Sequence, residues 1–287
     1  MPLTGTGRIV TAAAKDGRGV GAFNVIQLEH AQAIVAGAEA AGAPVVLQLS
    51  ENAVRYHGGL GPIATAVLAV AEAAGVPVAV HLDHATSADL IHHAVELGFS
   101  SVMFDASVLP YEENVRATAD VVAHCHAAGV WVEAELGEVG GKDGVHAPGV
   151  RTDPAEGAAF TAATGVDALA VAVGTSHAML TRDAALDFDL ISALRAAVPV
   201  PLVLHGSSGV ADEHLTAAVE HGMTKVNIAT HLNRVFTTAV REALAGDPRL
   251  VDTRRYLGAG RSAVAAEVTR LLGVLKAARR GGSVQTF

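Results

Sequence analysis

The chain has 287 residues, with 29 acidic against 20 basic side chains and a formal net charge of −9. No cluster of Lys and Arg follows the pattern of a nucleic-acid-binding surface, and no apolar run reaches the length of a membrane span, so neither partner is expected. Hydrophobic residues make up 51% of the chain, which excludes a mainly disordered protein. The N-terminus lacks the pattern of a signal peptide, and the lone Cys125 excludes an internal disulfide. We therefore expect a cytoplasmic protein with one domain, residues 1–287.

Eight short apolar segments rich in Val, Ala and Leu are typical of parallel strands that are covered on both faces. They lie at 19–25, 44–50, 77–83, 101–105, 130–136, 167–173, 201–207 and 225–229. Helical patterns separate them, for example at 28–42, 61–75, 86–98 and 111–129. This alternation predicts an α/β protein with a (β/α)₈ TIM barrel. A doubly wound open sheet is the alternative, but no GxGxxG motif follows the first strand.

Two further segments lie outside this alternation. Residues 262–280 have apolar residues at helical spacing and predict an extra C-terminal helix, packed outside the barrel or on a partner subunit. Residues 137–154 are rich in Gly and Pro and follow the fifth strand, where they form either a lid or a plain surface loop.

Histidines follow three of the predicted strands. His84 ends the third strand, His177 follows the sixth and His205 ends the seventh. The carboxyl ends of barrel strands converge on one mouth, so we expect these side chains to meet there. Three histidines and an open position are a ligand set of catalytic zinc. The alternative is three histidines that are hydrogen-bonded separately.

Carboxylates end the same strands. Asp83 directly precedes His84, which makes it the candidate acid or base beside a metal-polarised substrate. Glu133 and Glu135 share one face of their strand, and the one nearer the mouth is placed to orient a metal-bound histidine. For Glu133, an ion pair inside the barrel is the alternative. For His81, one pleat below Asp83, we expect a buried supporting hydrogen bond.

Two turns carry a possible phosphate signal. HGSSGV at 205–210 and NIATHLN at 227–233 each leave a strand and enter a helix through small residues, which expose backbone N–H groups. In barrels the loops after the seventh and eighth strands form a frequent phosphate site. The two turns together predict a phosphorylated substrate.

Seven strand-end motifs occur in order from about residue 7 to the C-terminal helix: GAFNV, HLDH, SVMFDAS, VEAELGEVGG, AVGTSH, LVLHGSSG and KVNIAT. In this combination the chain resembles the class II, zinc-dependent ketose-bisphosphate aldolases of the fructose- and tagatose-bisphosphate type. The resemblance implies reversible cleavage of a ketose 1,6-bisphosphate to dihydroxyacetone phosphate and glyceraldehyde 3-phosphate. It also implies a cytoplasmic lyase of carbohydrate metabolism, such as glycolysis.

The resemblance also assigns roles to residues. It implies one catalytic Zn²⁺ on His84, His177 and His205, with Asp83 moving the proton of the C4 hydroxyl. Asp105 and Glu135 match an alternative metal site near the first histidine. The implied substrate contacts, with Na⁺ or K⁺ near the phosphate, are Asn24, Ser50, Ala178, Gly206, Ser207, Ser208, Asn227, Ile228, Ala229, Thr230 and Arg254. Arg254 matches an arginine for the distal phosphate from a neighbouring subunit, which implies a homodimer or homotetramer.

The chain departs from the family pattern in three places. Ala178 stands where glycine is common after the second ligand. The loop GGKDGVH offers only Asp143 where the family has a carboxylate in GGxED. The segment ENAVRYHGG lacks the usual glycine after Ser50. These differences leave open fructose bisphosphate, tagatose bisphosphate or a phosphorylated deoxy-keto acid of inositol breakdown as substrate.

Other functions remain as alternatives. A Schiff-base aldolase would use Lys225, one of four lysines, which starts the last predicted strand away from the mouth. A metal-dependent hydrolase on this fold usually has HxH on its first strand, and this chain has none there. A non-catalytic subunit of an aldolase complex would keep the fold and lose the site, whereas Asp83 and all three histidines are present.

Overall fold

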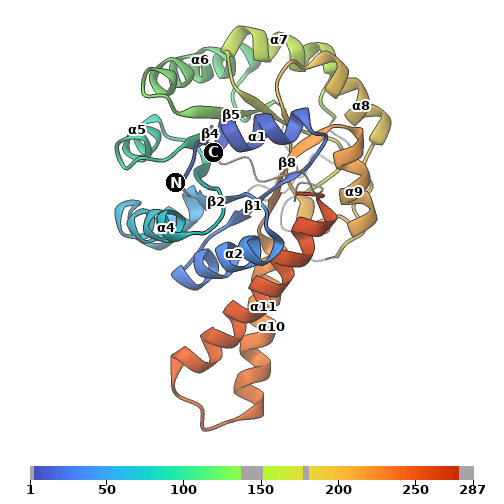
Figure 1. Ribbon diagram of the computed structural model, residues 1–287. Helices are drawn as coiled ribbons and strands as arrows, with labels where there is room; N and C mark the ends of the chain where they lie inside the picture. The colour runs from blue at the N-terminus through green and yellow to red at the C-terminus, as the bar shows by residue number, and fades with distance from the viewer. Residues whose placement is uncertain (1–2, 137–150, 177–180, 278–287) are drawn as a thin grey trace.

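Eight parallel strands close into a barrel in their sequence order, and β1 pairs with β8. A computed structural model describes residues 3–136, 151–176 and 181–277 (Figure 1). The strands are β1 (Val20–Asn24), β2 (Val45–Ser50), β3 (Val78–Ala85), β4 (Ser101–Phe104), β5 (Trp131–Leu136), β6 (Ala168–Val171), β7 (Leu202–Leu204) and β8 (Met223–Ile228). The predicted (β/α)₈ barrel is therefore confirmed.

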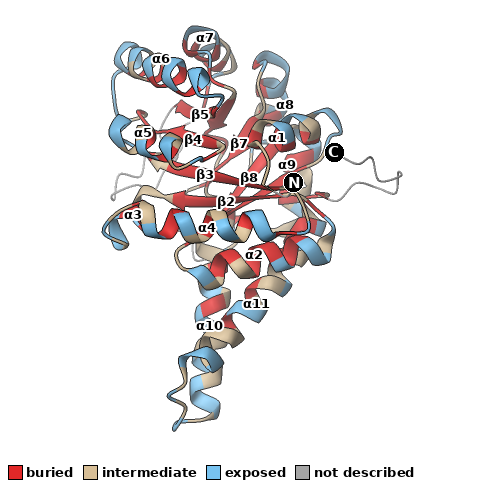
Figure 2. Cartoon of the chain, turned by 60° about the vertical axis from the view of Figure 1, so that its left-hand side comes forward, coloured by how far each residue is buried: buried red, intermediate tan, exposed pale blue. Residues whose placement is uncertain are grey.

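Helices surround this barrel, with their apolar sides turned inward and their outer sides exposed (Figure 2). The outer helices between the strands are α2 (Leu28–Ala41), α3 (Glu51–Tyr56), α4 (Gly61–Ala73), α5 (Ala88–Glu96), α6 (Tyr111–Ala127), α7 (Pro154–Thr164), α8 (Phe188–Ala197) and α9 (Asp212–His221). A short 3₁₀ turn, η1 (Ser207–Gly209), precedes α9. Among the described residues no helix has both the length and the apolar character needed to cross a membrane.

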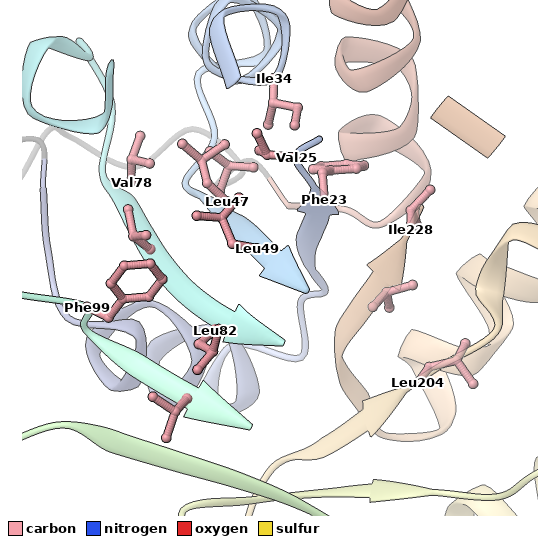
Figure 3. Packing of buried hydrophobic residues seen from close by; sticks show 14 of the residues in the cluster. Phe23, Val25, Ile34, Leu47, Leu49, Val78, Leu82, Phe99, Leu204 and Ile228 are labelled. Atoms are coloured by element: carbon pink, nitrogen blue, oxygen red, sulfur yellow. The ribbon is translucent and has the colours of Figure 1, made fainter. Parts of the chain in front are cut away.

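The main core lies between the strands and the outer helices. The residues that point outward from the strands, such as Phe23, Leu47, Leu49 and Leu82, are fully buried there against helix residues such as Ile34 (Figure 3). Because side chains alternate along a strand, the neighbouring residues point into the barrel. The Val- and Leu-rich runs therefore cover the barrel wall, and the intervening positions are left for the interior.

The amino-terminal end of the barrel is closed by a helix that the sequence pattern did not predict, α1 (Thr6–Lys15). Ile9, Val10 and Ala13 from α1 form a separate buried cluster with the inward-facing residues Val20, Ala22, Val46 and Ala79. Figure 1 shows α1 lying across the barrel. This end therefore buries mainly apolar side chains.

The last two helices form a hairpin that extends away from the barrel (Figure 1). They are α10 (Thr230–Gly246) and α11 (Thr253–Val274). α11 packs along α2, where a Cβ on Gly37 would come within 2.6 Å of the Ala265 carbonyl oxygen. The C-terminal helix therefore lies outside the barrel, as one predicted alternative had it, and it begins nine residues earlier than the predicted start at 262.

Candidate active site

The carboxyl end of β3 has an irregular backbone. The register between β3 and β4 shifts between Leu82 and Ala85, and His84 has a φ of 50°. A left-handed conformation is uncommon for a residue with a side chain, and such conformations gather at functional sites. In a regular strand Asp83 and His84 would point to opposite faces, and this bulge lets both side chains lie at the mouth, where a ligand atom of each lies within 4.8 Å of the other.

Asp83 lies at the centre of the mouth. Its side chain accepts hydrogen bonds from Asn24 Nδ2 at 2.8 Å and from Asn227 Nδ2 at 3.4 Å. Burial by itself would raise the pKa of this carboxyl group, but the charges of His84, Lys225 and other neighbours lower it to about 2. Asp83 is therefore a carboxylate at neutral pH, the state that can accept a proton.

The two described histidines of the predicted ligand set lie beside each other. The ring centroids of His84 and His205 are 4.7 Å apart. His84 Nδ1 donates to Asp105 Oδ2 at 2.8 Å, and Ser107 Oγ donates to the other oxygen of Asp105 at 2.7 Å. Asp105 is thus fixed on both sides and holds the ring of His84 in one orientation.

His205 is fully buried between two carboxylates. Its Nδ1 lies 3.0 Å from Glu135 Oε2, and its Nε2 lies 3.0 Å from Glu133 Oε1. Burial by itself would lower the pKa of His205, but the hydrogen bonds to Glu133 and Glu135 raise it to about 9. The imidazole is therefore held from both sides in a strongly anionic environment.

This geometry fits a zinc ion. One ligand atom each from Asp83, His84 and His205 lie within 4.8 Å of one another, and the same holds for His84, Asp105 and Glu135. Imidazole nitrogens and carboxylate oxygens are common zinc donors. Asp105 and Glu135, the predicted alternative metal site, are therefore grouped with His84. His177, Ala178 and Asp143 lie outside the described residues.

The two predicted phosphate turns are adjacent. Ser207 Oγ hydrogen-bonds to the Asn227 carbonyl oxygen, and the His231 N–H donates to Ser208 Oγ at 3.2 Å. Gly206 has a φ of 66°, and a Cβ there would lie 2.6 Å from the Ser176 carbonyl oxygen. Only glycine fits both the conformation and the space. Ile228 ends β8, Ala229 precedes α10 and Thr230 begins that helix, so its first N–H groups are near both turns.

Comparison with known proteins agrees with this arrangement. The family model for class II fructose-bisphosphate aldolase matches residues 4–280. The chain belongs to this family. A fructose-bisphosphate aldolase from Geobacillus stearothermophilus is 43% identical over 272 residues, which cover 93% of this chain and 95% of that protein. One from Staphylococcus epidermidis is 39% identical over 268 residues, covering 92% and 94%.

Solved structures extend the comparison. The YdjI aldolase from Escherichia coli K12 has a TM-score of 0.84 and 32% sequence identity, and the match covers 96% of this chain and 98% of that one. A fructose-bisphosphate aldolase from Campylobacter jejuni has a TM-score of 0.82 at 24% identity, covers 96% of both chains and supports the fold alone. The protein is therefore an aldolase, which is a lyase. Class II aldolases generally depend on zinc.

Two of the predicted substrate-binding residues, Ser50 and Arg254, lie at different distances from the mouth of the barrel. Ser50 pairs in register with Asp83, and its Oγ accepts a hydrogen bond from the Ala53 N–H at the start of α3. Arg254 instead lies at the far end of the hairpin, where its side chain is 89% exposed and pairs with Asp252 at 2.8 Å. Within one chain, therefore, Arg254 is not grouped with the other predicted residues.

Below Asp83, the aldolase site contains residues to which the sequence assigned no role in cleavage. Lys225 Nζ lies 2.8 Å from Glu133 Oε2, so the ion pair considered for Glu133 is present. Gln48 Nε2 donates to Asn24 Oδ1 at 3.1 Å. His81 Nδ1 hydrogen-bonds to Ser101 Oγ at 2.7 Å, as expected.

Strand β8 begins at Met223, two residues before its predicted start, so Lys225 lies inside the strand. A lysine in a buried strand requires a partner, which was the available signal.

Proposed function

We propose that the chain catalyses the reversible, zinc-dependent aldol cleavage of a ketose 1,6-bisphosphate, with fructose 1,6-bisphosphate as the first candidate. The products would be dihydroxyacetone phosphate and glyceraldehyde 3-phosphate. The observation that carries this proposal is the grouping of the ionised Asp83 with His84 and His205 within 4.8 Å. The names of the curated relatives support the choice of substrate.

In this proposal His84, His177 and His205 hold one Zn²⁺, and Asp105 and Glu133 hold the imidazoles of the two described ligands through His84 Nδ1 and His205 Nε2, which leaves the other nitrogen of each ring for the metal. When bound, zinc supplies Lewis acid catalysis by polarising the substrate ketone and stabilising the negative charge that develops during cleavage. Asp105 and Glu135 also provide the alternative metal ligands. Carboxylates behind zinc-bound histidines typically affect metal affinity or activity by about 10- to 100-fold.

Asp83 moves the proton in the proposed reaction. Its carboxylate accepts the proton of the C4 hydroxyl as the C3–C4 bond breaks, and returns it in the direction of condensation. Asn24 and Asn227 donate to its two oxygens and so fix the carboxylate in one plane. This support keeps Asp83 beside the polarised ketone, where proton transfer requires it.

The two turns bind the phosphate on the dihydroxyacetone side of the substrate. We assign the phosphate contacts to Gly206, Ser207 and Ser208 and to residues 227–230, with the backbone of Ala178 beside them and Na⁺ or K⁺ as a counter-ion. Backbone N–H groups at the start of α10 favour an anion there. Asn24 and Ser50 lie beside Asp83, and we assign them further substrate contacts.

A second copy of the chain completes the site in this proposal. Arg254 lies in the first turn of α11, after the far end of α10, whose 17 residues extend about 25 Å from the phosphate turn at 1.5 Å per residue. Its guanidinium group would therefore bind the distal phosphate in a neighbouring subunit of a homodimer or homotetramer. We further propose one catalytic domain over residues 1–287 and a cytoplasmic location, which the single free Cys125 supports.

A cleavage assay coupled to dihydroxyacetone phosphate detection tests this function. Purified protein with added Zn²⁺ is offered fructose bisphosphate, tagatose bisphosphate and the phosphorylated deoxy-keto acid in parallel. We expect zinc-dependent cleavage of fructose bisphosphate that a chelator abolishes and zinc restores. His205→Ala should lose the activity. No cleavage of any of the three would contradict the proposal and favour a non-catalytic subunit, whereas preference for another substrate would correct the substrate alone.

A further inference from the structure

Lys225 places a fully buried ammonium group beneath the catalytic carboxylate. Its side chain has no exposed surface, and its Nζ lies 2.8 Å from Glu133 Oε2 and donates to Asn227 Oδ1 at 2.8 Å. Burying a charge costs several kcal/mol of effective free energy even in a paired geometry. The role of Lys225 is therefore to be sought in the groups that its ammonium contacts.

One branch of contacts leads from Lys225 to Asp83. The ammonium group has only donors, so it accepts no hydrogen bond and binds the oxygen of the Asn227 amide. This choice turns the amide nitrogen of Asn227 toward Asp83 Oδ1, at 3.4 Å. Lys225 thereby decides which end of the amide faces the proton-transferring carboxylate.

The other branch leads to the metal ligand His205. Glu133 presents Oε2 to the ammonium group and Oε1 to His205 Nε2, each within 3.0 Å. His81 Nε2 lies on the far side, 4.0 Å from Glu133 Oε2, and makes no hydrogen bond among the described residues. The ammonium group therefore pairs with the oxygen of Glu133 that His205 does not use, and this ion pair restrains the carboxylate.

We propose that Lys225 is a positioning residue for aldol cleavage, which orients the Asn227 amide against Asp83 and the Glu133 carboxylate against His205. This inference rests on the proposed function of the same site. Two other roles for Lys225 give different results in the experiment below. A pure counter-charge for Glu133 would matter for stability alone, and a Schiff-base nucleophile would attack the substrate ketone.

The first experiment adds Lys225→Met to a chain that already carries Glu133→Gln. Glu133→Gln leaves a buried ammonium group without its carboxylate, so removing the ammonium should raise the midpoint of thermal unfolding. If Lys225 positions Asn227, the same step should lower kcat about tenfold at saturating substrate and zinc, with KM nearly unchanged. A counter-charge predicts that kcat stays constant or recovers, and this result would overturn the proposal.

Zinc affinity gives a second measurement that needs no substrate. Titration against a chelator should show that Lys225→Met alone weakens Zn²⁺ binding about tenfold, because Glu133 no longer holds His205 in a fixed plane. Unchanged zinc affinity would remove this branch of the proposal. If the wild-type protein cleaves none of the offered ketose phosphates, the proposed function fails while the zinc titration still tests Lys225.

Two controls complete the design. Val20→Ala removes apolar volume from the residue that pairs in register with Lys225, and it should lower stability while leaving kcat and zinc affinity unchanged. If Lys225→Met or Glu133→Gln alone fails to fold, the double variant, which removes both charges, is compared with the wild-type protein. We expect a reduced kcat, and full activity of the double variant would overturn the proposal. Borohydride inactivation in the presence of substrate, with a modified Lys225, would also overturn it.

Discussion

The two ends of the barrel are built from the same strands but from opposite kinds of side chain. At the amino-terminal end, the inward-facing Val20, Val46 and Ala79 pack against α1. Four residues further along the same strands, the inward-facing positions hold Asn24, Ser50 and Asp83, and Asn24 donates directly to Asp83. One end buries apolar surface, whereas the other collects hydrogen bonds and charge.

This difference separates stability from chemistry within one interior. Burial of apolar side chains under α1 stabilises the fold, whereas buried polar groups at the mouth must satisfy one another at some cost. The strained backbone at His84 lies at the polar end. Substitutions at the mouth should therefore change mainly kcat or zinc affinity, whereas substitutions under α1 should change mainly the free energy of unfolding.

The largest effect is expected from Asp83→Asn at the mouth. The amide keeps the shape but cannot take up the substrate proton, so kcat should fall by about 10² to 10⁴. The free energy of unfolding should change little, with a decrease rather than an increase at neutral pH, because the native site lowers the pKa of Asp83 and so favours the carboxylate that is lost. Steady-state cleavage and thermal unfolding measure both, with the exposed Asp120→Asn as the matched control. Activity within tenfold of wild type would rule out Asp83 as the proton carrier.

Asp105→Asn should have a smaller effect, on metal binding. The new amide has a single acceptor oxygen, so it cannot accept from both His84 Nδ1 and Ser107 Oγ as the Asp105 carboxylate does, and any bond it keeps to His84 loses the help of the negative charge. Zinc affinity should fall about 10- to 100-fold, and activity should recover at high zinc concentration. Chelator competition measures this change. A variant with unaltered zinc affinity but reduced kcat would instead place Asp105 on the substrate.

At the opposite end, Val10→Ala in α1 should reverse the pattern. Val10 is fully buried in the apolar cluster. Its truncation should lower the free energy of unfolding by about 1–3 kcal/mol, through lost transfer energy and a residual cavity. Below the unfolding transition kcat should not change. Denaturant titration alongside steady-state kinetics tests this, and a parallel fall in kcat would break the distinction between the two ends.

The smallest effect concerns His30 in α2, outside the barrel. Its ring stacks on Phe236, and neither nitrogen has a hydrogen-bond partner among the described residues. Burial lowers the pKa of His30 below 6.5, with an opposing contribution from Glu29. Below about pH 6.5 the unfolded chain therefore binds the proton more readily, so stability falls as pH decreases. His30→Leu should flatten this dependence in thermal unfolding, and an unchanged slope would contradict it.

The sequence predicted the barrel wall better than its interior. Runs such as PVVLQLS identify their strand directly, because both faces are buried and most of the residues are apolar. The cap helix α1 was missed since it follows no strand, and α3 was missed because it is only six residues long. Asp83 and His84 could be identified from their adjacency at a strand end. That both side chains reach the same site depends on the bulge after Leu82, where the register with β4 shifts.

The deeper part of the site depended on contacts across the barrel. Glu133 left two interpretations open from sequence, because strand parity gives its face but not its partner. Only closure of the barrel brings Lys225 from β8 to Glu133 on β5. The fold of one chain does not bring Arg254 to the site. It lies at the far end of the hairpin, so its proposed role depends on a second chain.

Anomalous diffraction at the zinc absorption edge, from crystals grown with Zn²⁺, tests the central claim most directly. We expect one strong peak at the carboxyl end of the barrel, about 2.0–2.1 Å from a nitrogen of His84 and of His205, with His177 as the third ligand. A peak elsewhere, for example between the stacked rings of His92 and His124 on the outer helices, or no peak at the mouth, would contradict it.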